Sequence, residues 1–237
     1  MKIKQKFIDR ENVLNNPLPV IAFIGDSVTQ GCFECFFNEK EQIDTVFRPH
    51  IAYSRLVADK LTAIYERVPP VIINAGISGD TANGISKRLE RDVLRFNPDL
   101  TVVSCGLNDC NRGDFELFTN SLREVFTNLK NAGSEVIFLT ENMMCTYVSS
   151  MLTDKRLIEI AERCATKQNG GEMDKYVQGA ITVAKECGVT VCDCYAKWKE
   201  MANNGVDTTA LLSNGINHPT AEMLNLFADE LVKIILE

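Results

Sequence analysis

Five short apolar segments, each bounded by turn residues, constrain the fold of this chain more than any other feature of its sequence. They are rich in Val and Ile and do not alternate between apolar and polar side chains, which is typical of strands buried on both faces. We therefore expect parallel strands that are covered on both sides. The segments are Pro19–Ile24, Val71–Asn74, Leu100–Cys105, Val136–Thr140 and Val189–Asp193.

The stretches between these segments carry apolar residues at helical spacing, so one stripe of each helix would face the core. Strand and helix in alternation predict a parallel sheet with right-handed crossovers. The predicted fold class is α/β: a single domain over residues 1–237, built as a three-layer α/β/α sandwich around a five-stranded parallel sheet. The helical stretches are Ile51–Glu66, Phe115–Leu129, Asp174–Cys187 and Pro219–Leu236.

One connection, residues 141–172, is much longer than the others. It contains a further helical pattern over Asp154–Ala165 and a glycine-rich joint at Asn169-Gly170-Gly171. Connections of this length are usually functional or disordered. Two interpretations stay open, a surface excursion and a lid or pocket wall. Its apolar residues fit either a small acyl pocket or the core, namely Met143, Met144, Tyr147, Met151 and Leu152.

Charge and composition exclude several classes of protein. The formal net charge is -7, and Lys and Arg are dispersed, which argues against nucleic acid as a partner. No apolar run approaches the roughly 20 residues that span a bilayer, and the N-terminus lacks the apolar stretch of an export signal. Nine scattered cysteines in such a chain indicate free thiols. We expect a cytoplasmic protein that does not act on membranes, with homo-oligomerisation left open.

The loops that leave the first three strands are where chemistry is expected, because ligands of open parallel sheets bind at the carboxyl ends of the strands. Taken alone, each loop is an ordinary turn. Together they offer a serine hydroxyl, glycine N–H groups and an asparagine amide, which are groups that attack a carbonyl or hold its oxyanion. The loops are Gly25-Asp26-Ser27, Asn74-Ala75-Gly76-Ile77-Ser78-Gly79-Asp80-Thr81 and Gly106-Leu107-Asn108-Asp109.

A base is the remaining requirement, and the chain holds only 2 histidines. His50 precedes a helical stretch and fits a helix start. His218 stands directly before Pro219, which fits the first position of the last helix, and the loop Ser213–Asn217 precedes it. His218 is therefore the candidate base.

These loops and the late His-Pro, in this order, resemble the four sequence blocks of the SGNH, or GDSL, hydrolases. The resemblance extends over residues 21–219. It implies a flavodoxin-like topology, with Ser27 as nucleophile and His218 as general base. It also implies an oxyanion hole made from the backbone N–H groups of Ser27 and Gly79 and the side chain of Asn108. No metal or organic cofactor is implied.

One position departs from this family pattern. Many relatives carry an aspartate three residues before the histidine, and this chain has Gly215 there. Asn214 is the nearest polar neighbour, and its carbonyl could orient the imidazole without supplying a charge. A backbone carbonyl could serve instead, and the sequence does not choose between the two.

The function we predict is a serine hydrolase that cleaves small acyl esters, either O-acetyl groups of carbohydrates or short-chain esters. Two alternatives stay open: an acyl thioesterase, and a non-catalytic relative that binds an acylated small molecule. The Gly-x-Ser-x-Gly elbow, the Gly-x-Gly-x-x-Gly fingerprint and the P-loop are all absent. A metal site is disfavoured because Cys32-Phe33-Glu34-Cys35 has no second pair at finger spacing.

Overall fold

The computed structural model covers residues 1–237, and a five-stranded parallel sheet forms its centre. The strand order is β4-β1-β5-β6-β7, in which the second strand of the sheet lies outside the first, as in flavodoxin. Each predicted apolar segment supplies one strand, and the predicted fold class is confirmed. The strands are β1 (Val20–Gly25), β4 (Val71–Gly76), β5 (Leu100–Ser104), β6 (Glu135–Leu139) and β7 (Thr190–Cys192).

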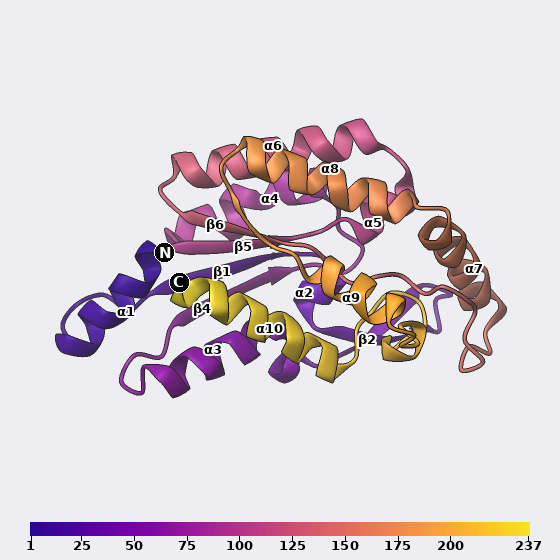
Figure 1. Ribbon diagram of the computed structural model, residues 1–237, viewed down its shortest axis with the longest axis horizontal. Coiled ribbons are helices and arrows are strands. Elements are labelled where there is room, and N and C mark those ends of the chain that lie inside the picture. The colour runs from indigo at the N-terminus through magenta and orange to yellow at the C-terminus, as the bar shows by residue number, and fades with distance from the viewer.

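Helices cover both faces of the sheet (Figure 1). On one face lie α4 (Ala82–Asp92), α6 (Phe115–Asn131) and α8 (Glu172–Glu186), which pack against one another in that order. On the other face α3 (Tyr53–Ile64) packs against α10 (Ala221–Leu236), and α1 (Lys2–Asn12) and α9 (Cys194–Asn203) also contact α10. This arrangement is the three-layer sandwich predicted from the alternation of strands and helices.

The core explains why these segments take up these positions. Every residue of β5 is buried, and the apolar stripe of α6, which includes Leu122 and Phe126, faces the sheet. Burial of one such side chain contributes about 1.5–3 kcal/mol. The core is continuous, with 60 buried apolar residues in one cluster. No helix is long and apolar enough to cross a bilayer.

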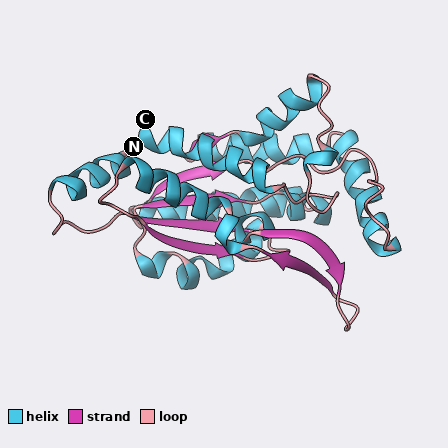
Figure 2. Ribbon diagram, turned by 90° about the horizontal axis from the view of Figure 1, so that it is seen from below, coloured by secondary structure: helices cyan, strands magenta, loops and turns pink.

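A β-hairpin that the sequence pattern did not predict lies at the carboxyl end of the sheet. Its strands are β2 (Cys32–Phe37) and β3 (Ile43–Phe47), and Figure 2 shows it projecting from the layered body. The Asn38 side chain accepts hydrogen bonds from two N–H groups of the connecting turn, and Glu41 takes a left-handed conformation at φ 59. The short helix α2 (Ser27–Gln30) and α7 (Lys155–Asn169) lie at the same end (Figure 1).

The long connection over 141–172 begins inside the protein. Residues 141–145 are buried, and the helix predicted over Asp154–Ala165 is confirmed as α7. Arg156 of α7 stacks its guanidinium on the ring of Phe37 and pairs with Glu41, both on the hairpin. The connection therefore contacts the hairpin beside the carboxyl ends of the strands.

Candidate active site

Ser27 lies at the carboxyl end of β1, at the first residue of α2. The turn is sharp because Gly25 has no side chain: a Cβ there would lie 2.3 Å from the carbonyl oxygen of Ser104. Asp26 caps α2 by accepting the N–H of Val28 at 2.9 Å. Together these contacts present the Ser27 hydroxyl at the edge of the sheet.

His218 contacts Ser27 directly. Its Nε2 lies 2.9 Å from the Ser27 Oγ, and both residues are buried. Its Nδ1 lies 2.6 Å from the carbonyl oxygen of Phe33, in β2. A carbonyl can only accept, so Nδ1 carries the proton and Nε2 presents a lone pair to the serine hydroxyl. This is the tautomer that a general base needs.

The protonation state of His218 follows from its surroundings. Burial lowers the pKa of His218 below its ordinary value of 6.5, while the Phe33 carbonyl and the charge of Glu34 act in the opposite direction. The net lowering keeps the imidazole neutral at pH 7. A neutral imidazole can accept a proton from Ser27.

Asn214 does not contact the imidazole, so the prediction that Asn214 orients the ring directly is wrong. Its side-chain oxygen accepts the N–H groups of Ile216, Asn217 and His218, each at 2.9 Å, and is fully used there. Asn214 therefore fixes the loop that carries His218. The alternative, a backbone carbonyl, describes the observed contact, because the unpredicted hairpin brings the carbonyl of Phe33 to Nδ1.

Gly79 and Asn108 line the same cleft as Ser27 and His218. The backbone N–H groups of Ser27 and Gly79 donate no hydrogen bond within the protein. Gly79 has φ +78, a left-handed conformation that favours glycine. The structure thus brings together the four residues singled out from sequence, with two N–H donors free to bind an anion.

The amide of Asn108 is already engaged. Its Nδ2 donates to the Oδ2 of Asp26 at 2.9 Å and to the carbonyl oxygen of Asp80 at 3.0 Å. These two acceptors fix the orientation of the amide. An oxyanion would either share one of these N–H donors with its present acceptor, in a three-centre hydrogen bond, or take the place of that acceptor.

The cleft around Ser27 has a volume of about 510 Å³. Its walls combine polar and apolar side chains, with Asp44 as the one charged residue and neither Lys nor Arg. The hairpin supplies Ile43 and Phe47, and α7 supplies Ile160. The candidate acyl-pocket residues are not part of this lining, which corrects that interpretation: Met143 and Met144 are buried in the core, and Tyr147 and Met151 are exposed.

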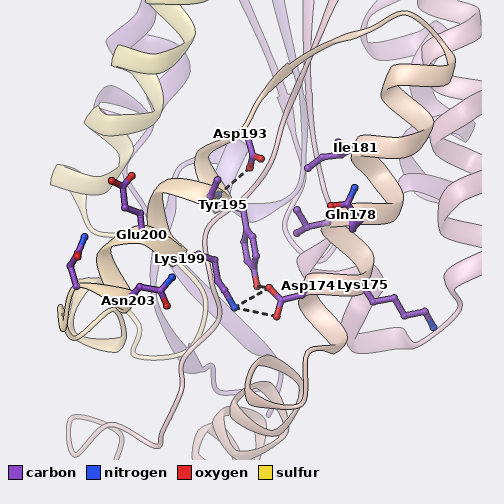
Figure 3. Close-up of a pocket in the computed structure, with 12 residues that line it drawn as sticks. Asp174, Lys175, Gln178, Ile181, Asp193, Tyr195, Lys199, Glu200 and Asn203 are labelled. Carbon is purple, nitrogen blue, oxygen red and sulfur yellow. Dashed lines mark hydrogen bonds and ion pairs between the residues drawn. The ribbon is translucent and has the colours of Figure 1, made fainter.

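A larger hollow of about 900 Å³ lies elsewhere, between α8 and α9 (Figure 3). Three of its polar side chains are partnered with one another. The Tyr195 hydroxyl donates to Asp174 at 3.0 Å, and Lys199 pairs with the same carboxylate at 3.1 Å. None of the four candidate residues lines it. The cleft at Ser27 is therefore the candidate active site.

The family model of the GDSL-like lipase/acylhydrolase family matches residues 23–223, a range that includes all four candidate residues. The chain belongs to this family. Family membership confirms the resemblance seen in the sequence blocks and supports carboxylic ester hydrolysis as the class of reaction.

Known proteins similar to this family member include an acetylxylan esterase of Geobacillus stearothermophilus. The two sequences are 32% identical over 89 residues, which span 38% of this chain and 39% of that esterase. The crystal structure of an acetylxylan esterase from the same organism superposes with a TM-score of 0.67 at 21% identity, covering 92% of this chain and 94% of the other. An alpha/beta hydrolase enzyme from the metagenome of Lake Arreo, Spain, has a TM-score of 0.67 at 20% identity, covering 92% and 96%.

The pH dependence of this GDSL-like chain should follow from the lowered pKa of His218. Only the neutral imidazole can act as a base, so kcat/KM should rise with pH and reach half its maximum below pH 6.5, the ordinary value. The measurement is kcat/KM for a neutral ester between pH 4 and 8. A midpoint above 6.5 would mean that a different group, or a His218 stabilised in its charged form, controls the reaction.

Proposed function

We propose that this chain is a serine esterase that removes small acyl groups from neutral alcohols, with carbohydrate O-acetyl esters as the favoured substrates. The observation that carries the proposal is the Ser27–His218 contact of 2.9 Å, in which the far nitrogen of the imidazole is held by a carbonyl. A hydroxyl is a weak nucleophile unless a base removes its proton. His218 is in position to do so.

In the proposed mechanism the Ser27 oxygen attacks the ester carbonyl while its proton moves to the Nε2 of His218. The N–H groups of Ser27 and Gly79 and the amide of Asn108 hold the tetrahedral oxyanion. The imidazolium then protonates the leaving alcohol, and an acyl-enzyme remains. Water, deprotonated by the same imidazole, attacks the acyl-enzyme, releases the acid and restores Ser27.

A carbonyl in place of the usual aspartate changes how the imidazolium is stabilised. The Phe33 oxygen carries a partial charge only, at 2.6 Å from Nδ1. The nearest influential carboxylate is Glu34, whose charge favours protonated His218 but is partly neutralised by Arg48 at 2.7 Å. The proposed nucleophile and base therefore form a Ser–His dyad, in which a backbone carbonyl orients the imidazole.

The favoured substrate class rests on two observations. The matched relative is an acetylxylan esterase, whose name specifies an acetylated carbohydrate. The cleft is lined by one carboxylate, Asp44, and by no cation. Acyl thioesters of coenzyme A carry several phosphate charges, which Lys and Arg would normally bind. A neutral alcohol fits this cleft better than such a thioester.

The non-catalytic alternative is less consistent with the geometry. A protein that only binds an acyl group has no need of an imidazole hydrogen-bonded to a serine hydroxyl at 2.9 Å. Nor does it need two free N–H donors in the same cleft. Together these features support chemistry on a carbonyl carbon.

The substrate proposal can be tested with two panels of esters. The first varies the acyl chain of p-nitrophenyl esters from acetate to octanoate, and the second compares acetylated xylo-oligosaccharides with acetyl-coenzyme A by acetate release. We expect kcat/KM to be highest for acetyl groups, and carbohydrate esters to be preferred over the thioester. A preference for octanoate, or for the thioester, would contradict the proposed substrate class.

Replacing Asn108 by alanine should lower kcat by about 10²–10³-fold with little change in KM, because an oxyanion donor acts on the transition state. Asn111→Ala is the matched control, since Asn111 lines the same cleft but bonds the Sγ of Cys164 instead. Its kcat should stay close to that of the wild type. An Asn108→Ala effect confined to KM would assign Asn108 to substrate binding.

A further inference from the structure

We propose that Glu141, two residues after the end of β6, is a positioning residue of the active site whose protonated carboxyl group donates a hydrogen bond to Asp26. This inference rests on the proposed esterase function. Through that bond Glu141 would hold the two segments that carry Ser27 and Asn108 in their working arrangement. Neither the four sequence blocks nor the mechanism above uses Glu141.

The contacts of Glu141 place it beneath the candidate oxyanion hole. Its side chain is buried, at 1% exposure. Its Oε2 accepts the N–H of Leu107, the residue before Asn108, at 3.0 Å. Its carboxyl group also lies within hydrogen-bonding reach of the carboxyl group of Asp26. Glu141 thus links the loop after β5 to the loop after β1.

Asp26 completes this link. One of its oxygens accepts the N–H of Val28 at 2.9 Å, and the other accepts the amide of Asn108 at 2.9 Å. Asp26 is itself fully buried. Any shift of its carboxyl group would therefore move both the start of α2, where Ser27 lies, and the Asn108 amide.

Two carboxyl groups in contact and out of water cannot both be ionised without a cation, because burial and like charge both oppose the second charge. The hydrogen bonds made to both groups come from amide donors, and neither takes part in an ion pair. One proton is thus expected between them. The Oε1 of Glu141 accepts no conventional hydrogen bond, which suits the oxygen that carries this proton.

The hydrogen bonds place that proton on Glu141, because Asp26 accepts two N–H donors that stabilise its charge and Glu141 accepts only one. Burial and the charge of Asp26 raise the pKa of Glu141 well above its ordinary range, whereas burial raises the pKa of Asp26 to about 6. At pH 7 the arrangement is a neutral Glu141 that donates to an ionised Asp26. An ionised Asp26 is the stronger acceptor for the Asn108 amide.

The other titratable groups around the pair reinforce this assignment. Asp109, in the same loop as Leu107, has its pKa raised to about 7 by burial, and its charge also opposes ionisation of Glu141. Asp80 adds a negative charge that acts on Asp26, but Arg88 pairs with it at 2.7 Å. The buried Cys105 and Tyr53 are neutral, since burial raises the pKa of both. No cation contacts the pair directly.

The test compares Glu141→Gln with Glu141→Leu. The glutamine amide can donate to Asp26 while its oxygen accepts the Leu107 N–H, so Glu141→Gln should keep kcat within about threefold of the wild type. Leucine can do neither, and kcat should fall at least tenfold with KM little changed, as for loss of a transition-state contact. Glu162→Gln, an exposed glutamate on α7, is the matched control.

The pH profile supplies a readout that a merely structural role would not move. In the wild type, deprotonation of Glu141 at alkaline pH should place a second charge beside Asp26 and lower kcat. Glutamine does not titrate, so Glu141→Gln should lack this alkaline decrease. Three results would each overturn the proposal. They are a wild-type kcat in Glu141→Leu, an equal loss of kcat in both variants, and an alkaline decrease in kcat that persists in Glu141→Gln.

Infrared spectroscopy separates this proposal from the esterase function, because it requires no turnover. Asp109, whose pKa is raised to about 7, would add a band of its own at pH 7, so the comparison is made in an Asp109→Asn background. In that background the carbonyl stretch of a protonated carboxylic acid should be present at pH 7 and absent after Glu141→Gln. It should also persist in an inactive Ser27→Ala background. If the band survives Glu141→Gln in the Asp109→Asn background, the proton lies elsewhere and the inference fails, whatever the activity of the protein.

Discussion

Ser27→Ala should lower kcat for p-nitrophenyl acetate by about 10⁶-fold. The remaining rate is the one that substrate binding and the oxyanion donors support without a nucleophile. The reason is that no other hydroxyl contacts the imidazole of His218, so no acyl-enzyme can form. The side chain of Ser27 is small and makes its one side-chain hydrogen bond to His218, so the fold should persist. Initial rates and the thermal unfolding midpoint are measured on the same preparation.

Ser78→Ala is the matched control for this experiment. Ser78 lines the same cleft, but its side chain does not contact His218, and it is exposed. Its loss should leave kcat within a few-fold of the wild type. Full activity in Ser27→Ala would end the assignment of the nucleophile, and a collapse of activity in Ser78→Ala would point to a different serine.

His218→Ala should reduce kcat by a comparable factor, since nucleophile and base act as one unit. The double variant Ser27→Ala/His218→Ala should be no worse than either single variant, because once one partner is gone the other has nothing to act on. The measurement is kcat for all three variants under identical conditions. Additive losses in the double variant would mean that the two residues do not act in the same step.

His50→Ala is the natural control, as His50 is the other of the 2 histidines in the chain. It lies in the short helical turn Pro49–Ile51, outside the residues that line the cleft. We expect its kcat to equal that of the wild type. If His50→Ala loses activity and His218→Ala keeps it, the base has been misidentified.

The fold was predictable because its strands are buried on both faces. Segments such as Leu100–Cys105 must be apolar throughout to sit between two layers of helices, and that pattern is visible in the sequence. The hairpin β2–β3 was missed because it is short and lies outside the main sheet, where no such burial marks it. Its signal was present in the aromatic and β-branched residues of Cys32–Phe37 and Ile43–Phe47, on either side of a polar turn.

The candidate site was likewise predictable only in part. Ser27, Gly79 and Asn108 follow strands of the sheet, so strand ends alone indicated that they would meet. The partner of the His218 Nδ1 is a main-chain carbonyl, and every residue has one, so no side-chain pattern could identify Phe33. Glu141 was missed as well, because its role depends on a buried contact with Asp26 between loops that are far apart in sequence.

Labelling with a fluorophosphonate tests the central claim most directly, since only a serine activated by a base forms the covalent adduct. Peptide mass spectrometry of the treated protein should locate the adduct on Ser27, and His218→Ala should abolish it while His50→Ala leaves it intact. An unlabelled wild-type protein, or an adduct on any other serine, would contradict the account.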